Sequence, residues 1–379
     1  MSTPVGCPQA PDRGLAGGPG RPSFGRVGRS DRLAPLLATA VVTALVAAGS
    51  LLGAPPAAAD PRPTAVVALG DSAASGDGAG GYEAGTRGEG GNWCHRSPRA
   101  YVHHTDLAAT PVNLACSGAA AADVGLGTGT HYTEGSQAAR LVEVARRYRV
   151  QAVVLQVGAN DEAALLGTGI ACIRAFLDPS VRPCRETIGP RLPQRMATTG
   201  QAVGAAVRDV QEAMRRAGYT RGDYQLVLVS YAAAPITERM VPLAAAGGCP
   251  YSRADAGWGR TTLFPALSTE LRAVAGRTGA HFLDLARATE GREACSRATP
   301  AQEWQRRITV APEALVHGGL DAVGYHLAQE SFHPKAAAHA EFGRCLGAFV
   351  RSGDPTGACV PGADGHLRLD RSSVRAPST

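Results

Sequence analysis

The sequence predicts an α/β protein, a three-layer α/β/α sandwich around a central, mostly parallel five-stranded sheet. Two observations lead to this prediction. Short apolar runs bounded by turn residues alternate with longer amphipathic stretches, and such alternation produces a parallel sheet with helices on both faces. The composition agrees: 44% of the 379 residues are hydrophobic and 18% are charged, which is typical of a globular protein with a large core.

Five apolar runs between Pro63 and Ser352 predict buried strands, because turn residues bound each of them. They are Thr64–Leu69, Val112–Ala115, Ala152–Val157, Gln225–Ser230 and His281–Leu283. Helices are predicted for four longer amphipathic stretches, Ser136–Tyr148, Gly200–Ala217, Pro265–Thr278 and Pro334–Val350. We therefore expect one folded domain over residues 60–359 and a flexible C-terminal tail over residues 360–379, which is rich in Arg, Ser, Pro and Gly.

Residues 1–59 are expected to be a signal peptide that is removed. An uncharged apolar run, Leu33–Leu52, follows an arginine-containing stretch and precedes a small-residue A-x-A site, Ala57–Ala59. Because a bilayer is spanned by about 20 apolar residues, an uncleaved signal anchor is the alternative. Cleavage is favoured because several residues make the run a poor span: Pro35, Thr39, Thr43, Gly49 and Ser50. We therefore expect a secreted protein without a stable membrane anchor.

The charge balance argues against a nucleic-acid-binding protein. The formal net charge is +6, but the leader contributes five arginines against two aspartates, so about half of this excess lies outside the expected mature chain. A small excess without a run of arginines lacks the electrostatic surface that nucleic-acid binding requires. We expect a monomer without a nucleic-acid partner.

Eight cysteines follow the leader, and an even number in an exported chain predicts a disulfide framework. Pairing neighbours along the chain is the simplest of many connectivities. It gives the pairs Cys94–Cys116, Cys172–Cys184, Cys249–Cys295 and Cys345–Cys359. A zinc site is the competing interpretation, but the C-x2-C and H-x3-H spacings typical of zinc ligands are missing among these residues. No metal is therefore expected.

Four short segments carry polar groups at or near the predicted carboxyl edge of the sheet, where parallel sheets bind their ligands. Gly70–Ser72, Cys116–Gly118 and Gly158–Asp161 follow the first three strands, and Ser331–Pro334 opens the last helix. Together they supply a hydroxyl, a flexible backbone N–H, a carboxamide and an imidazole. Acyl transfer requires this set of groups.

The expected roles follow from the chemistry of each group. Ser72 is the candidate nucleophile and His333 the base that takes its proton. The oxyanion of the tetrahedral intermediate needs donors, which the N–H groups of Ser72 and Gly118 and the carboxamide of Asn160 can supply. Each residue also has a purely structural interpretation, because Ser, Asn and Gly are common in turns and caps. A secreted surface-binding protein with a dead site is therefore the competing class.

In this order, the four segments resemble the SGNH (GDSL-type) hydrolase family, and in particular its secreted bacterial lipases and esterases. The resemblance extends from about residue 64 to 345, and includes the glycine-rich loop Gly76–Tyr82, the segment Cys94–Pro98 and Ala115–Gly118. It implies an SGNH-like fold and a serine esterase or lipase that acts on small ester or lipid substrates without a cofactor. It also supports the pair Cys94–Cys116. A carbohydrate O-deacetylase with the same machinery is the alternative.

One position departs from the family pattern, which has an aspartate three residues before the histidine. Glu330 stands there in this chain. The resemblance to secreted relatives with a Glu-Ser-aromatic-His-Pro segment implies that a backbone carbonyl orients His333, which would make a Ser–His dyad. The alternative is that Glu330 orients the imidazole, but its longer side chain would need a different rotamer, with an entropic cost. We therefore expect the carbonyl.

Overall fold

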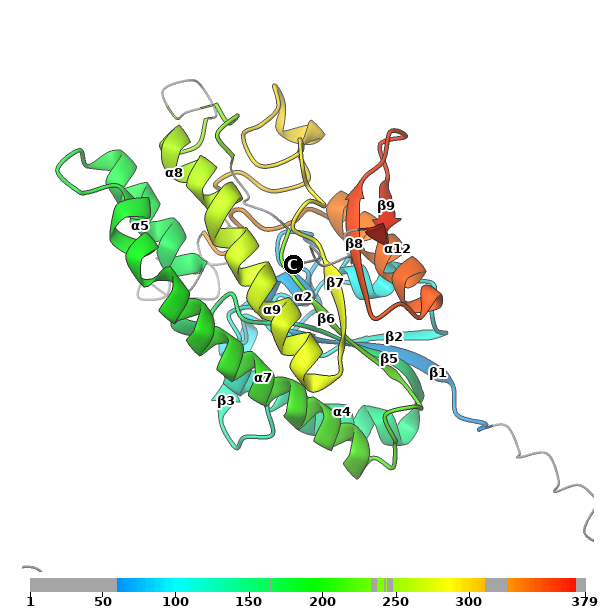
Figure 1. The fold of residues 1–379 in the computed structure, drawn as a ribbon. Helices are drawn as coiled ribbons and strands as arrows, with labels where there is room; N and C mark the ends of the chain where they lie inside the picture. Colours follow the sequence, from blue (N-terminus) through cyan, green and yellow to red (C-terminus); the bar gives the residue numbers. More distant parts are fainter. Residues whose placement is uncertain are drawn as a thin grey trace, which may run out of the picture. The chain divides into compact units, whose positions relative to one another are not determined.

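A seven-stranded sheet lies at the centre of the computed structural model, which describes residues 60–372 except 164, 233–236, 242, 244–247, 311–325 and 327. Its strands are β1 (Thr64–Gly70), β2 (Thr110–Asn113), β5 (Arg149–Gln156), β6 (Gln225–Val229), β7 (His281–Asp284), β8 (Thr356–Pro361) and β9 (Leu367–Asp370). They lie in the order β2-β1-β5-β6-β7-β8-β9 (Figure 1), and all neighbours are parallel except β8 and β9. A separate antiparallel pair consists of β3 (Thr130–His131) and β4 (Glu134–Gly135).

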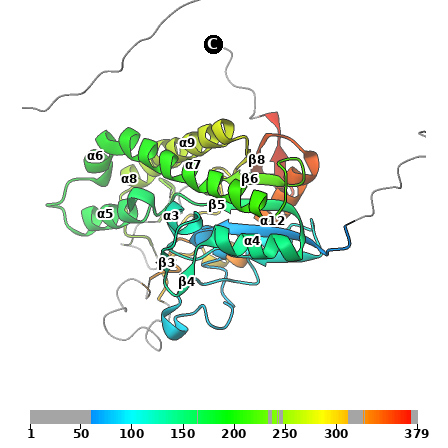
Figure 2. The ribbon, with the colours of Figure 1, turned by 90° about the horizontal axis from the view of Figure 1, so that it is seen from below.

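Helices cover both faces of the sheet (Figure 1, Figure 2). The longer ones are α4 (Gln137–Arg147), α5 (Leu166–Leu177), α7 (Leu192–Arg216), α9 (Phe264–Thr278) and α12 (Ala336–Ser352). The short ones are α2 (Ser72–Ser75), α3 (Ala121–Val124), α6 (Cys184–Ile188) and α8 (Arg253–Trp258), with the π-helical turn η5 (Gly259–Leu263). Single 3-10 turns are η1 (Glu89–Gly91), η2 (Tyr101–His104), η3 (Asp161–Ala163), η4 (Gly189–Arg191) and η6 (Pro300–Gln302).

Alternating side chains of the strands divide the core into two layers, because successive residues of a strand point to opposite faces. In β1, Val67 and Leu69 belong to the cluster that contains α4, α7 and α9. Val66 and Ala68 belong to the cluster on the other face, which contains α12. The predicted three-layer arrangement is therefore confirmed.

The five predicted strands and four predicted helices are all present, but the expected number of strands was wrong. The two additional strands, β8 and β9, lie at the sheet edge beyond β7. They also correct the expected tail, because residues 360–361 and 367–370 belong to the sheet and, of the expected tail, only residues 373–379 lie outside the described residues. Leu367 is 2% exposed and packs in the cluster with α12. The short alternation of leucine with charged residues in β9 is a weak sequence signal.

The structure pairs the cysteines as neighbour pairing predicts: Cys94–Cys116, Cys172–Cys184, Cys249–Cys295 and Cys345–Cys359. The last pair connects α12 to β8, which helps to explain why the chain remains in the sheet after residue 359. Among the described residues, no helix has the length and apolarity needed to cross a membrane. The expected leader lies outside the described residues.

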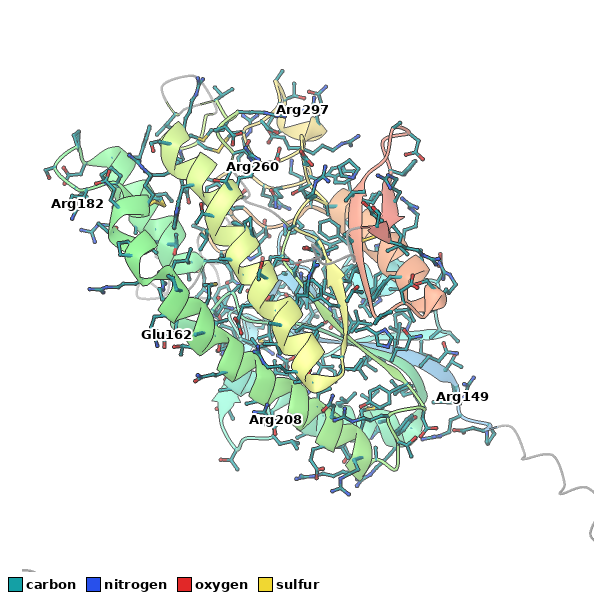
Figure 3. All side chains as sticks on the ribbon, viewed as in Figure 1. Arg149, Glu162, Arg182, Arg208, Arg260 and Arg297 are labelled. Atoms are coloured by element: carbon teal, nitrogen blue, oxygen red, sulfur yellow. A yellow bond between two sulfur atoms is a disulfide. The ribbon has the colours of Figure 1, made fainter. Side chains whose placement is uncertain are left out.

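Figure 3 shows charged side chains from different elements pointing away from the fold, among them Arg149, Arg208, Arg260 and Arg297. These four arginines come from separate parts of the chain.

Glu134 is a charged residue that the fold holds in place. Its side chain is 14% exposed and accepts hydrogen bonds from Arg96, at 2.5 and 2.8 Å, and from Asn92, at 2.9 Å. Arg140 of α4 forms a further ion pair with it. Burial alone would raise the pKa of Glu134, but these donors outweigh it and lower the pKa from 4.5 to about 2. Glu134 thus connects the β3–β4 pair, the segment after Cys94 and α4.

We expect Glu134→Gln to lower the free energy of unfolding at pH 7 by about 2 kcal/mol, because charge-assisted hydrogen bonds are weakened. Since the folded-state pKa lies below the ordinary value of 4.5, this stabilisation is present above that pH and is lost as the pH falls toward 2. Urea unfolding at pH 7 and at about pH 3 measures the difference. Glu143→Gln, at a position 60% exposed, is the matched control. A deficit that does not depend on pH would contradict this account.

Candidate active site

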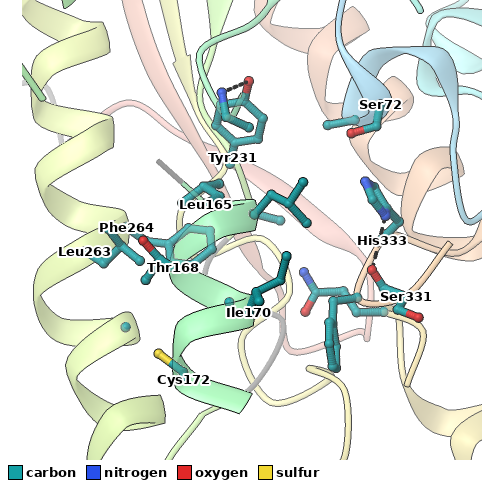
Figure 4. Close-up of a pocket in the computed structure, with 18 of the residues that line it drawn as sticks. Ser72, Leu165, Thr168, Ile170, Cys172, Tyr231, Leu263, Phe264, Ser331 and His333 are labelled. Atoms are coloured by element: carbon teal, nitrogen blue, oxygen red, sulfur yellow. Dashed lines mark hydrogen bonds between the residues drawn. The ribbon is translucent and has the colours of Figure 1, made fainter. Parts of the chain in front are cut away.

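The four polar segments meet at the carboxyl edge of the sheet. Ser72, Asn160 and His333 line one cavity of about 590 Å³, and Ser117 lines it next to Gly118. Figure 4 shows Ser72 and His333 on one side of this cavity, opposite the apolar side chains of α5 and α9. The parallel sheet therefore brings together residues that are far apart in the sequence.

The turn that carries Ser72 is held by its neighbours on both sides. Gly70 has φ 137°, and a Cβ there would lie 1.9 Å from the carbonyl oxygen of Gln156, so only glycine fits. Asp71 accepts a hydrogen bond from the Ala73 N–H at 3.0 Å and one from the Tyr231 hydroxyl at 2.5 Å. Burial raises the pKa of Asp71 to about 7. Asp71 therefore braces the turn that presents Ser72.

His333 is positioned by a strained backbone. Phe332 has φ 64°, which is uncommon for a large side chain. Two backbone hydrogen bonds with Arg306, at 2.9 and 3.1 Å, hold this segment in place. Nδ1 of His333 lies 3.2 Å from the Ser331 carbonyl oxygen (Figure 4). Because a carbonyl only accepts hydrogen bonds, this contact favours the proton on Nδ1 and leaves Nε2 as an acceptor.

Glu330 makes other contacts. One carboxylate oxygen accepts a hydrogen bond from the Tyr82 hydroxyl at 2.6 Å, and the other lies 3.1 Å from Nη1 of Arg306. In the described part of the chain, the His333 ring forms its hydrogen bond with the Ser331 carbonyl and not with this carboxylate. The geometry therefore favours the carbonyl as the group that orients the imidazole.

Three hydrogen-bond donors were predicted to form an oxyanion site, the N–H groups of Ser72 and Gly118 and the carboxamide of Asn160. Among the backbone hydrogen bonds of the described turns and loops, none has the N–H of Ser72 or Gly118 as donor. Gly118 has φ 81°, and a Cβ there would lie 3.2 Å from the Tyr132 hydroxyl. Asn160 donates one amide hydrogen to the Ala119 carbonyl oxygen at 3.0 Å, which fixes its carboxamide. Its second amide hydrogen can bind an anion.

The apolar wall of the cavity was not predicted from the sequence. The wall includes Ile170 and Ile173 of α5 and Leu165, which directly precedes this helix. Leu263 and Phe264, at the junction of η5 and α9, complete it. Apolar residues at helical spacing in α5 were the available signal for this wall. The buried residue Cys172 of α5 belongs to a small cluster separate from the two clusters that pack on the sheet. Among the described residues, no group of three or more His, Cys, Asp or Glu side chains is arranged to hold a metal ion.

Several solved structures are similar to this chain. A phospholipase A1 from Streptomyces albidoflavus has 20% identity and a TM-score of 0.46, over 76% of this chain and 97% of that chain. An extracellular lipase from Streptomyces rimosus has 22% identity and a TM-score of 0.45, over 73% and 95%. A carbohydrate acetylesterase from Sinorhizobium meliloti has 11% identity and a TM-score of 0.36, over 77% and 100%.

No curated protein matches the sequence significantly. The model of the GDSL-like lipase/acylhydrolase family matches residues 68–341, which include the four polar segments and most of the sheet. This match confirms the family resemblance that those segments predict. Because it covers well over half of the sequence, the chain belongs to the GDSL-like lipase/acylhydrolase family.

Proposed function

We propose that this protein is a secreted serine esterase or lipase that hydrolyses carboxylic esters through an acyl-enzyme on Ser72. One observation supports this most directly. Ser72, Asn160 and His333 line the same cavity, and the Ser331 carbonyl favours the imidazole tautomer that can accept a proton from a serine. Membership of the family adds a second, independent support.

In the proposed mechanism, Nε2 of His333 takes the proton of the Ser72 hydroxyl as Oγ attacks the ester carbonyl carbon. The negative charge that develops on the carbonyl oxygen is stabilised by the N–H groups of Ser72 and Gly118 and by the Asn160 amide. The intermediate collapses, and the alcohol leaves with the proton from the imidazolium. A water molecule then attacks the acyl-enzyme, again with His333 as base, and the carboxylic acid is released.

The cavity favours a lipid ester over an acetylated sugar. Its volume of about 590 Å³ is far larger than an acetyl group needs, and its wall includes Leu165, Ile170, Leu263 and Phe264. Burying an acyl chain against such a wall is favourable by about 0.8 kcal/mol for each methylene group. We therefore place the acyl chain of the substrate against α5 and α9.

Secretion is part of the proposal because disulfides persist in oxidising compartments. The structure contains four disulfides within residues 94–359. The apolar run before residue 60 provides the expected export signal. A non-catalytic surface protein with the same fold remains the alternative class, and a covalent serine probe separates the two.

We expect a fluorophosphonate probe to label the wild-type protein and to fail on Ser72→Ala, because the probe reacts only with an activated serine. Ser72→Ala should also abolish hydrolysis of p-nitrophenyl esters. Asn160→Ala should lower turnover by roughly 10²–10³, the usual effect of losing one oxyanion donor. Ser180→Ala, at an exposed position on a loop, is the control. A wild-type protein that is inert to both reagents would rule out the proposed function.

Glu330→Gln should lower turnover by less than about tenfold, a barrier change under ~1.4 kcal/mol, because the Ser331 carbonyl remains next to Nδ1 of His333. Steady-state kinetics on a p-nitrophenyl ester, with thermal unfolding as a check on folding, measures this. If the folded variant instead lost a thousandfold or more, Glu330 would be the acid of a triad and the dyad would be wrong.

Filling the cavity should change the preferred acyl chain. Ile173 lines the cavity from α5, so Ile173→Trp should lower kcat/KM for a decanoate ester by about tenfold, because the long chain loses its place against the wall. Hydrolysis of the acetate ester should be unaffected. Leu177→Trp, on the same helix but 62% exposed and outside the cavity lining, is the matched control. An equal loss with both esters would contradict the assigned acyl site.

A further inference from the structure

Asp77 is a fully buried carboxylate where three loops of the candidate active site meet. It follows Ser72 by five residues, and its N–H donates to the Ser72 carbonyl oxygen at 3.1 Å. Oδ2 accepts hydrogen bonds from the Ser117 hydroxyl at 2.7 Å and from Nε2 of Gln329 at 3.0 Å. Ser117 immediately precedes Gly118, and Gln329 lies in the segment that carries His333. Asp77 thus connects three segments of the candidate site, which carry Ser72, Gly118 and His333.

The loop of Asp77 also packs directly against His333. The next residue, Gly78, has φ 85°, and a Cβ there would lie 2.7 Å from Cβ of His333 and 2.7 Å from the carbonyl oxygen of Pro334. Arg306 Nε donates to the Gly78 carbonyl oxygen at 2.6 Å, so the segment that holds His333 also holds this loop. The residue that follows Asp77 therefore packs closely against His333 and the start of the last helix.

The surroundings of Asp77 keep it charged. Burial by itself would raise the pKa of Asp77, but positive charge on His333 and His95 and the hydrogen bonds from His95 and Ser117 outweigh it and hold the pKa well below the usual range. Nδ1 of His95 lies 3.2 Å from Oδ1. A buried charge of this kind is tolerated only when it is paired and hydrogen-bonded.

We propose that Asp77 is a positioning residue for the proposed hydrolysis, on which this inference rests. Its carboxylate ties Ser117 and Gln329 to the loop after Ser72, which keeps the Gly118 N–H and His333 in register with the nucleophile. Its negative charge stabilises the imidazolium that forms when His333 takes the serine proton. In a Ser–His–Asp triad, the aspartate contacts Nδ1 of the histidine and stabilises the imidazolium. In the proposed dyad a carbonyl occupies that position, and Asp77 supplies the negative charge from further away.

Other titratable or charged groups surround this pair. They are Tyr82, His95, His131, Arg306, His326, Glu330 and His339. All of these groups remain in an Asp77 variant. A change in the pH profile of that variant therefore reports the loss of the Asp77 carboxylate.

The test compares Asp77→Asn with the wild-type protein in kcat, KM and the pH profile of kcat/KM on a p-nitrophenyl ester. We expect kcat to fall by about tenfold or more with KM nearly unchanged, a smaller loss than the roughly 10²–10⁴-fold of general-base catalysis itself, because His333 remains in the variant. The acidic limb, which reports protonation of the base, should move to lower pH by about one unit, because a nearby negative charge no longer favours the cation. Asp209→Asn is the matched control, since Asp209 of α7 accepts from the Leu126 N–H away from the cavity.

A merely structural role would lower kcat in parallel with thermal stability and leave the acidic limb in place, and that result would overturn the proposal. Ser117→Ala gives a second, independent test if Asp77→Asn does not fold. This variant removes the Ser117 hydroxyl that donates to Oδ2 of Asp77, so less of the negative charge of Asp77 is compensated. The acidic limb of the kcat/KM profile should therefore move to higher pH. An unchanged or lower limb in that variant would also refute the role of Asp77. Failure of the proposed function itself is distinguishable, because it would already leave the wild-type protein without ester hydrolysis or probe labelling.

Discussion

The close contact between β1 and β5 at their carboxyl ends is the constraint on which the site depends. Gly70 leaves no room for a side chain against the Gln156 carbonyl, which also accepts the Asp71 N–H at 3.0 Å. Gln137 of α4 binds both backbone groups of Gly70, at 2.7 and 2.8 Å. These buried hydrogen bonds satisfy the backbone where the strand ends and the turn with Ser72 begins. The turn is thereby fixed beside the residues that follow β5, including Asn160.

Two buried aspartates flank Ser72, and their surroundings give them different states. Burial dominates at Asp71 and raises its pKa to about 7, so this carboxyl braces the turn through Tyr231 and the Ala73 N–H. At Asp77, nearby histidines and several donors outweigh burial and lower the pKa. An aspartate thus braces the turn at position 71 and, as we propose, positions the imidazole of His333 at position 77. Neighbouring charge and donors, more than burial, separate them.

The apolar wall of the cavity is supported differently from the polar edge. α5 is joined to α6 by the Cys172–Cys184 disulfide, and Arg185 of α6 pairs with the buried Asp255 of α8 at 3.1 Å. The wall therefore depends on a disulfide and an ion pair outside the sheet. Loops and peripheral helices tolerate change better than a packed core, so this wall can change without disturbing the edge of the sheet that carries the candidate site.

The sequence by itself determined the α/β class, five of the seven strands and the family, whereas the pairing of neighbouring cysteines was only the simplest of many possibilities until the structure placed the pairs together. These features rest on local patterns, such as apolar runs that end in Gly-Asp-Ser or Gly-x-Asn-Asp. It also predicted that Ser72, Gly118 and Asn160 lie at one edge, because the carboxyl ends of parallel strands meet there, and that His333 lies at the start of the last helix. The tertiary structure alone decided which partners the remaining polar groups take. Glu330 binds Tyr82, 248 residues earlier, and Gln329 reaches Asp77, 252 residues earlier. No local periodicity encodes such contacts, since they depend on which loops the packed sheet places side by side.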